Sequence, residues 1–216
     1  MEDTNPNQIQ KTLREKLGTP ITQRTDVENE ILGRLRYFHE WYKKRDESKA
    51  EEFVKELMVQ QIQIIGTNGV YQGDDEWFSG YEAAIKLVQS DWKYWGDLTL
   101  YLQHAQIDVE ENSGWATVFG TMTLDPDKAE YMKFEASKSR VLKKIKETAE
   151  TQNKDSTLAL HKIIKESITI LHQYQQENVF VWPLRISFGF VKRSNKWWMK
   201  QMHFSYPSKG FPSVRL

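Results

Sequence analysis

The sequence predicts an α+β fold, with helices first and a meander of long strands after them. In the N-terminal half, apolar residues recur at helical spacing, namely Ile31, Leu32, Leu35, Phe38, Trp41 and Tyr42. In the C-terminal part, residues 185–207 form two alternating apolar and polar runs around a short polar turn at 192–195, which is typical of an antiparallel hairpin. The two periodicities place helices early and strands late.

The helices follow from local start signals. Thr25 or Asp26 can cap the first helix. A second, short helix is predicted over 50–58. Ser79 and Glu82 have the spacing of a capping box and would begin a third helix, whose predicted buried stripe is Tyr81, Ala84, Ile85, Val88 and Trp92.

The strands are predicted over 60–65, 98–109 and 115–124, and again from Val181 to the end of the hairpin. In the hairpin, the even-numbered residues from Trp182 to Phe190 are all apolar, so this face is expected to point to the core.

The domain prediction has three parts. Residues 1–25 are expected to be a flexible N-terminal arm, 26–207 a single α+β domain, and 208–216 an irregular tail. Within the domain, residues 125–178 interrupt the strand pattern and are predicted to be an inserted αα-hairpin.

Composition excludes several classes of function. The 216 residues carry 30 Lys and Arg against 30 Asp and Glu, so the basic footprint of a nucleic-acid-binding protein is absent. There is no Cys, which excludes disulfides and a thiol nucleophile. No apolar run is long enough to cross a membrane and the first residues lack the apolar core of a secretory signal, so we expect a cytoplasmic protein without nucleic-acid or membrane partners.

Short motifs resemble a known family. The hairpin pattern Arg185-x-Ser187 with Trp197-x-Met199-x-Gln201-x-His203-x-Ser205 is similar to the closing hairpin of SnoaL-like domains, which belong to the nuclear transport factor 2 (NTF2) and ketosteroid isomerase superfamily. Ile65-Gly66-Thr67 and the run from Gly80 to Ile85 are similar to the family's first strand and its G-x-E-A-I helix. The resemblance covers roughly residues 27–124 and 179–207.

This resemblance implies a cone of curved antiparallel sheet wrapped on the N-terminal helices, a cystatin-like α+β roll with a pocket between sheet and helices. It also implies a homodimer through the sheet and a small hydrophobic ligand. The implied pocket residues are Tyr37, Trp41, Trp92, Met122, Phe188, Phe190, Trp198, Met202 and Phe204. The opposite face would carry a polar network of Arg185, Ser187, Gln201 and His203.

Three functions remain open. The first is a small-molecule-binding or dimerisation module without an assigned activity. The second is an isomerase, cyclase or hydratase that acts on a hydrophobic or polycyclic substrate. The third is a scaffold that binds partners through the inserted hairpin, with Ile163, Ile164, Ile168 and Leu171 as its stripe.

The residues do not identify a catalytic group. A ketosteroid isomerase needs a carboxylate base, and residues 65–68 contain none; Asp74, Asp75 or Asp91 could supply one, although solvated acids are the favoured interpretation. Tyr37 is either a proton donor or a packing residue.

The sequence does not assign a single role to the histidines either. His203 is either a general base or, preferably, a structural histidine bonded to Ser187 or Ser205 in a buried network. His104 is expected on a solvated face, and His161 and His172 lie too far apart along one helix to share a metal ion. We therefore predict neither a metal site nor a cofactor.

Overall fold

The computed structural model describes residues 14–67, 76–124 and 180–205, together with isolated positions at 11, 69, 72, 139, 142, 143, 146 and 164. The chain divides into two compact units, 7–122 with 181–216, and 1–6 with 123–180. The helices and strands named below lie in the first unit, except for residues 123, 124 and 180 at the ends of two strands. The αα-hairpin predicted over 125–178 is described only at isolated positions, and the tail over 208–216 lies outside the described residues, so those boundaries stay predictions.

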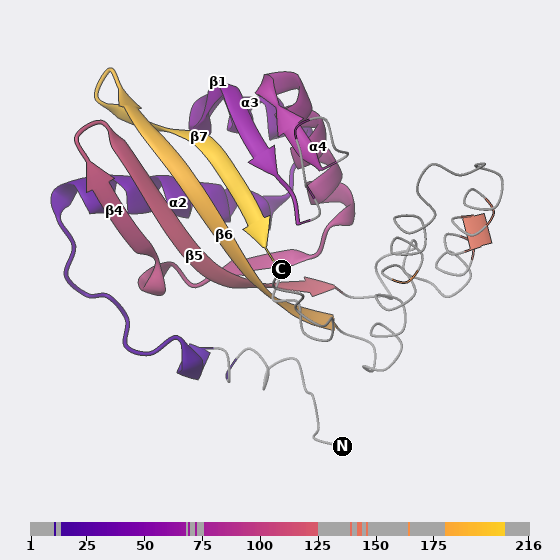
Figure 1. Ribbon diagram of the computed structural model, residues 1–216, viewed down its shortest axis with the longest axis horizontal. Helices are drawn as coiled ribbons and strands as arrows, with labels where there is room; N and C mark the ends of the chain where they lie inside the picture. The colour runs from indigo at the N-terminus through magenta and orange to yellow at the C-terminus, as the bar shows by residue number, and fades with distance from the viewer. Residues whose placement is uncertain are drawn as a thin grey trace, which may run out of the picture. The chain divides into compact units, whose positions relative to one another are not determined.

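The helices begin where the sequence predicts. Helix α2 (Asp26–Lys44) starts with a capping box in which the Thr25 hydroxyl accepts from the amide of Glu28 and the Glu28 carboxylate accepts from the amide of Thr25. A 3-10 turn, η1 (Glu47–Lys49), leads into α3 (Ala50–Leu57). Figure 1 shows α2 passing behind the sheet.

Helix α4 (Gly80–Tyr94) also follows its predicted start, but its capping box is wrong. Ser79 is the N-cap residue, yet its side chain makes no capping hydrogen bond. Ser79 also ends strand β2 (Trp77–Ser79), where it pairs with Gln63. Gly80 then turns the chain into the helix with φ of 82°, a conformation that glycine adopts without strain.

The sheet has the order β2-β1-β7-β6-β5-β3, with β4 paired to β5. Its other strands are β1 (Met58–Ile65), β3 (Asp97–Leu100), β4 (Gln106–Glu110), β5 (Ser113–Leu124), β6 (Phe180–Arg193) and β7 (Lys196–Ser205). The α+β prediction of a curved sheet on N-terminal helices is confirmed, with one correction: the sheet is mixed, because β1 runs parallel to β7. These two strands are far apart in the sequence, so no hairpin fixes them antiparallel.

The single strand predicted over 98–109 is broken. Strand β3 ends at Leu100, a 3-10 turn η2 (Leu102–His104) follows, and β4 begins at Gln106. Both β3 and β4 lie along β5. Backbone bonds from the amide of His104 to the carbonyl of Tyr101 and from Ala105 to Leu102 make the turn, so one interrupted strand replaces the predicted continuous one.

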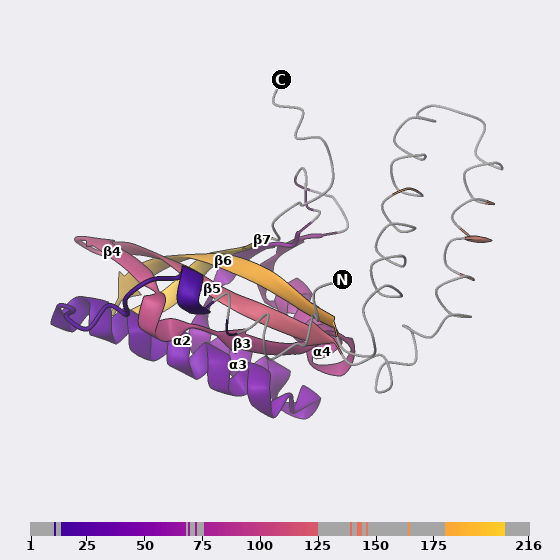
Figure 2. The ribbon, with the colours of Figure 1, turned by 90° about the horizontal axis from the view of Figure 1, so that it is seen from below.

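The helices α2, α3 and α4 cover one face of the sheet (Figure 2). Between them lies a core in which Phe38 of α2 meets Phe188 of β6 edge to face, with ring centroids 5.4 Å apart. Phe188 and Phe190 stack at 6.2 Å, and both are buried. From Leu184 to Phe190, the even-numbered face of β6 therefore points to the core as predicted.

The face prediction fails at the start of β7. The alternation predicts Trp198 on the same face as Met202 and Phe204. In the structure Trp198 pairs with Val191, whereas buried Met199 pairs with Phe190. An irregularity between Gly189 and Phe190 shifts the register, and a shift of one residue moves a side chain to the opposite face. Trp197, which is 2% exposed, is the tryptophan of β7 that lies in the core instead.

Candidate ligand-binding site

A cavity of about 240 Å³ opens where the ends of β1 and β7 meet α4. Its apolar walls come from strands β1, β2 and β7, from α4 and from the residue after α4, namely Ile64, Phe78, Leu87, Trp95 and Phe204. Trp95 and Phe204 meet edge to face, with centroids 5.5 Å apart. This end of the fold thus offers an apolar recess with aromatic sides.

The polar lining of the cavity comes from Gly66, Thr67, Glu76 and Asp91. The Thr67 hydroxyl donates to Oε2 of Glu76 at 3.4 Å. A Cβ on Gly66 would lie 2.6 Å from the same oxygen, so a larger residue at this position would require the Glu76 side chain to shift. Two acids therefore share a small, mainly apolar cavity.

Asp91 lies in the last turn of α4 and is only partly exposed. Its Oδ2 accepts a hydrogen bond of 2.9 Å from the hydroxyl of Tyr42, which comes from α2. Burial raises the pKa of Asp91 to about 7, against the lowering effects of the Tyr42 hydrogen bond and the Arg45 charge. Burial also raises the pKa of Tyr42 well above its ordinary value, so Tyr42 remains a proton donor.

Arg45 holds the end of α4 beside this pair. It is the C-cap of α2, with φ of 53°, and its Nε donates to the carbonyl of Trp92 at 2.8 Å. Its Nη2 donates to the carbonyls of Asp91 and Trp95, and its Nη1 pairs with Asp97 at 2.9 Å. The guanidinium group thus donates hydrogen bonds to carbonyl groups at the C-terminal end of α4. It lowers the pKa of the Asp91 carboxyl only through its charge.

Most of the predicted pocket residues lie away from this cavity. Of the nine, only Phe204 lines it. Met122, Phe188, Phe190 and Met202 are buried in the packed core. The remaining helix residues pack around Phe53 of α3: Tyr37 stacks on it at 6.3 Å, Trp41 lies at 6.2 Å and Trp92 at 5.2 Å.

Trp198 lies on the other face of the sheet, where the ammonium of Lys196 sits 4.3 Å from its ring. Tyr37 is half-buried, and burial is the main cause that raises its pKa. Its contacts with Phe53 and Trp41 match the packing interpretation.

The predicted polar network is only partly assembled. The Nε of Arg185 donates to the Ser205 hydroxyl, which in turn donates to the Arg185 carbonyl, both at 3.2 Å. Ser187 lies opposite His203, and Gly189 lies opposite Gln201. His203 is exposed, so a buried network around it is wrong: it follows buried Met202 on the strand and therefore points to the outer face.

Two further interpretations need correction. His104, expected on a solvated face, is 8% exposed, because the turn η2 replaces the strand on which it would have pointed outward. Asp91, expected to be solvated, lines the cavity. Its signal was present in the sequence, since it follows Val88 by three residues and Leu87 by four on the buried side of α4. Asp74, Asp75, His161 and His172 lie outside the described residues.

Among the described residues, no cluster of three His, Asp or Glu side chains could hold a metal ion. None of the helices described is both long and apolar enough to cross a membrane.

Comparison with solved structures identifies the class of fold. An NTF2-like protein of unknown function from Pseudomonas putida KT2440 matches 87% of this chain and 91% of its own, with 11% identity and a TM-score of 0.50. An NTF2-like superfamily protein from Salmonella enterica serovar Typhimurium matches 88% and 97%, with 14% identity and a TM-score of 0.51. An NTF2-like protein from Streptomyces avermitilis with a suggested dehydratase activity matches 85% and 98%, with 10% identity and a TM-score of 0.51.

The fold is therefore that of NTF2-like proteins. No protein-family profile matches the sequence. No curated protein matches it either.

Proposed function

We propose that this chain is a small-molecule-binding module of the SnoaL-like type, and that the cavity beside Asp91 is its binding site. The observation that carries the proposal is one recess that joins aromatic and aliphatic walls to a partly buried carboxyl group. Ligand sites in proteins combine mainly apolar linings with a few polar groups that fix orientation.

The size of the cavity limits the ligand. Sites for drug-sized molecules hold about 300–1,000 Å³, whereas this cavity holds about 240 Å³. A ligand of one or two rings, with one polar group that bonds Asp91, fits these dimensions better than a four-ring molecule. Near neutral pH Asp91 can either donate or accept that bond, because its pKa is about 7.

A matched pair of variants tests the site. Leu87→Trp places a large side chain in the cavity, whereas Gln89→Trp makes the same addition at an exposed position of the same helix. Indole, benzyl alcohol and 1-indanone serve as probes in calorimetric titrations. Binding of at least one probe that is lost in Leu87→Trp and kept in Gln89→Trp supports the proposal. Binding that survives in Leu87→Trp, or no binding of any probe, overturns it.

Proton transfer is the second candidate function, in an isomerase, cyclase or hydratase. It is favoured by one observation: Asp91 faces the cavity with a pKa of about 7, and a general acid or base works best when its pKa is near the working pH. The test is exchange of the α-protons of 1-indanone in deuterated water. Catalysed exchange that Asp91→Asn abolishes supports this function, and exchange at the rate of buffer alone contradicts it.

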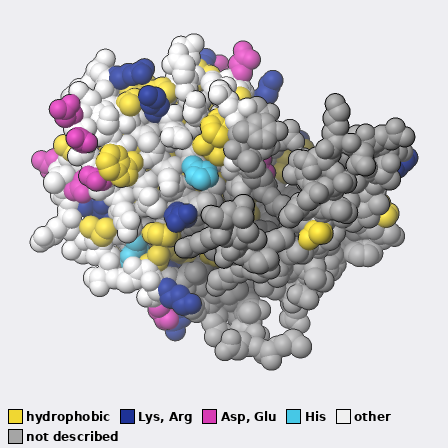
Figure 3. Space-filling view, in the orientation of Figure 1, with side chains coloured by type: hydrophobic (Ala, Val, Ile, Leu, Met, Phe, Trp, Pro, Cys, Tyr) yellow, Lys and Arg dark blue, Asp and Glu magenta, His cyan; other side chains and the backbone are white. Residues whose placement is uncertain are grey.

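The outer face of the sheet is our proposed homodimer surface. Trp115 of β5 is 49% exposed there, and Trp198 of β7 is half-exposed. Figure 3 shows this side of the sheet, with apolar side chains set among charged and polar ones. Light scattering should give twice the chain mass for the wild type and the single mass for Trp115→Lys, and a monomeric wild type would contradict the proposal.

A further inference from the structure

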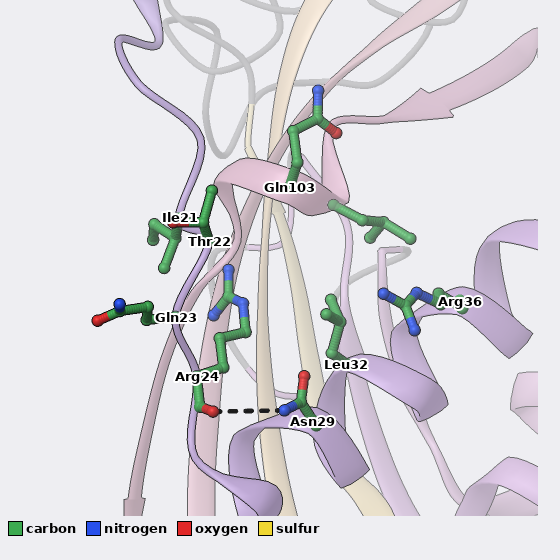
Figure 4. Close-up of a pocket in the computed structure, with 9 residues that line it drawn as sticks. Ile21, Thr22, Gln23, Arg24, Asn29, Leu32, Arg36 and Gln103 are labelled. Carbon is green, nitrogen blue, oxygen red and sulfur yellow. Dashed lines mark hydrogen bonds between the residues drawn. The ribbon is translucent and has the colours of Figure 1, made fainter.

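A second, separate groove lies between α2, the segment that precedes it and the turn η2. Its walls are the segment before the helix (Ile21 to Arg24), one side of α2 and the turn η2, and it holds about 560 Å³ (Figure 4). This volume lies within the range of small-molecule sites, about 300–1,000 Å³. From α2 come Asn29, Leu32 and Arg36, which share one side because they are three, four and seven residues apart.

The walls of the groove are fixed to one another. The amide of Ile21 donates to the carbonyl of Gln103 at 2.9 Å, and Nη2 of Arg24 donates to the carbonyl of Ala105 at 2.6 Å. Nδ2 of Asn29 donates to the carbonyl of Arg24 at 3.4 Å, the bond that is dashed in Figure 4. The segment before α2 is thus tied both to the helix and to η2, so the groove exists before any ligand binds.

The charge of the groove has one sign. Two guanidinium groups, of Arg24 and Arg36, line it, and none of the nine described residues around it is acidic. Arg24 has five N–H donors and uses one of them on Ala105. Arg36 is exposed and forms no hydrogen bond or ion pair with any described residue.

Nearby acids are engaged elsewhere. Glu40, one turn after Arg36, pairs with Lys43 at 3.3 Å. Glu28 accepts hydrogen bonds from the amide and hydroxyl of Thr25 at the start of the helix, and the nearby charge of Arg24 makes a smaller contribution to lowering its pKa. The positive charge of the groove is therefore local, since the whole chain has a formal net charge of zero.

The groove also has apolar surface between the two arginines. Leu32 is 5% exposed and forms its base, and Leu102 and Ile21 flank it, the latter 42% exposed. A guanidinium group binds carboxylates and phosphates through paired hydrogen bonds. An anion that carries a compact apolar group would satisfy the arginines and cover these side chains together.

We propose that this groove binds a small organic anion, a carboxylate or a phosphate ester with a compact apolar body, through Arg24 and Arg36. The site is independent of the cavity beside Asp91, so either proposal can fail without the other.

The test titrates the full chain with phenyl phosphate and with phenylacetate, which separate the two kinds of anion. Benzyl alcohol tests the apolar part without the anion, and inorganic phosphate tests the anion without the apolar part. The amide signals of Gln23, Asn29 and Gln103 report the groove. We expect saturable shifts there with at least one of the two organic anions, weaker binding at higher salt, and at least tenfold weaker binding of both single-part probes.

The variant R36Q removes one guanidinium at an exposed position and leaves the bonds of Arg24 intact. It should weaken binding about tenfold or more, as expected for loss of charged hydrogen bonds. R193Q is the control, because Arg193 is an exposed arginine at the β6–β7 turn, away from the groove. This variant should bind like the wild type. The proposal is overturned if neither organic anion saturates, if R36Q binds as the wild type does, or if inorganic phosphate or benzyl alcohol binds equally well.

Discussion

The hydroxyl of Tyr42 donates a hydrogen bond of 2.9 Å to the carboxyl of Asp91, and this bond joins α2 to α4 at the edge of the cavity. The donor is a tyrosine that is 3% exposed and whose ring stacks on Phe38 at 4.4 Å. Because the tyrosine cannot move without disturbing the core, the carboxyl group is held in place. A ligand in the cavity would therefore contact a carboxyl group, that of Asp91, whose position is fixed.

Asp91→Asn should remove a pH dependence from folding stability. The folded protein binds a proton at Asp91 at about pH 7, whereas an ordinary aspartate does so near 3.8. Between these pH values the folded state holds more protons, so this group makes stability fall as pH rises from about 4 to 7, and it has no further effect above that range. Urea unfolding from pH 4 to 8 should show the variant gaining roughly 2–4 kcal/mol relative to the wild type.

Parallel stability curves for the two proteins over this range would contradict that expectation. The comparison isolates Asp91, because other groups that titrate there, such as His39, are the same in both proteins. His39 works in the opposite direction: burial lowers its pKa, so its contribution rises as pH increases.

Tyr42→Phe should raise the pKa of Asp91 further. The hydroxyl bond stabilises the charged carboxylate, and the substitution removes it while the ring stays against Phe38. We expect a loss of about 1–2 kcal/mol in stability and an upward shift in an NMR titration of the Asp91 carboxyl carbon. Tyr81→Phe is the control. Tyr81 lies in the same helix as Asp91, ten residues before it, and its hydroxyl donates to the carbonyl of Met58 at 3.0 Å rather than to Asp91. An equal shift in both variants would refute the role of the Tyr42 bond.

The two adjacent tryptophans of β7, Trp197 and Trp198, should differ sharply in how much stability the protein loses when each is replaced by alanine. Trp197 is buried, and its indole N–H donates to Oε2 of Glu30 at 2.9 Å. Trp197→Ala should cost about 3–5 kcal/mol, whereas Trp198→Ala should cost less, because Trp198 is half-exposed and lies against Lys196 on the outer face. Denaturant titration measures both, and a larger loss at Trp198 would show that the register of β7 is wrong.

Gly120→Ala should destabilise the sheet where β3 approaches β5. A Cβ at this position would overlap the carbonyl oxygen of Thr99, which belongs to the backbone and cannot rotate away. We expect a loss of about 1–3 kcal/mol in thermal unfolding. Gly189→Ala provides the comparison, because its Cβ would lie 3.5 Å from Gln201 in ordinary contact, and its stability should change by less than about 0.5 kcal/mol.

The sequence predicted the helices and the face of β6 because their signals are local. Thr25 and Glu28 form the cap of α2, and Phe188 and Phe190 alternate with small or polar residues. It failed where one residue changes the register, as at Trp198, and where distant strands meet, as at the parallel pair β1 and β7. Neither the register shift nor the parallel pairing can be predicted from the alternation of apolar and polar residues.

The site was predicted less well than the fold. Aromatic residues such as Phe188 were assigned to a pocket, but aromatic side chains fill cores as readily as they line cavities. The location of the cavity depends on how far α4 and β7 diverge at their ends, which no single segment encodes. Asp91 was within reach of sequence reasoning, because the helical spacing from Leu87 and Val88 turns it inward.

The most direct test of the account is a methyl NMR titration of the protein with indole. Ile64 and Leu87 line the cavity, whereas Ile31 and Ile62, which are as buried as Ile64, do not line it. We expect saturable shifts of the Ile64 and Leu87 methyl signals while those of Ile31 and Ile62 stay in place. Shifts that leave Ile64 and Leu87 unaffected, or that spread evenly over the core, would contradict it.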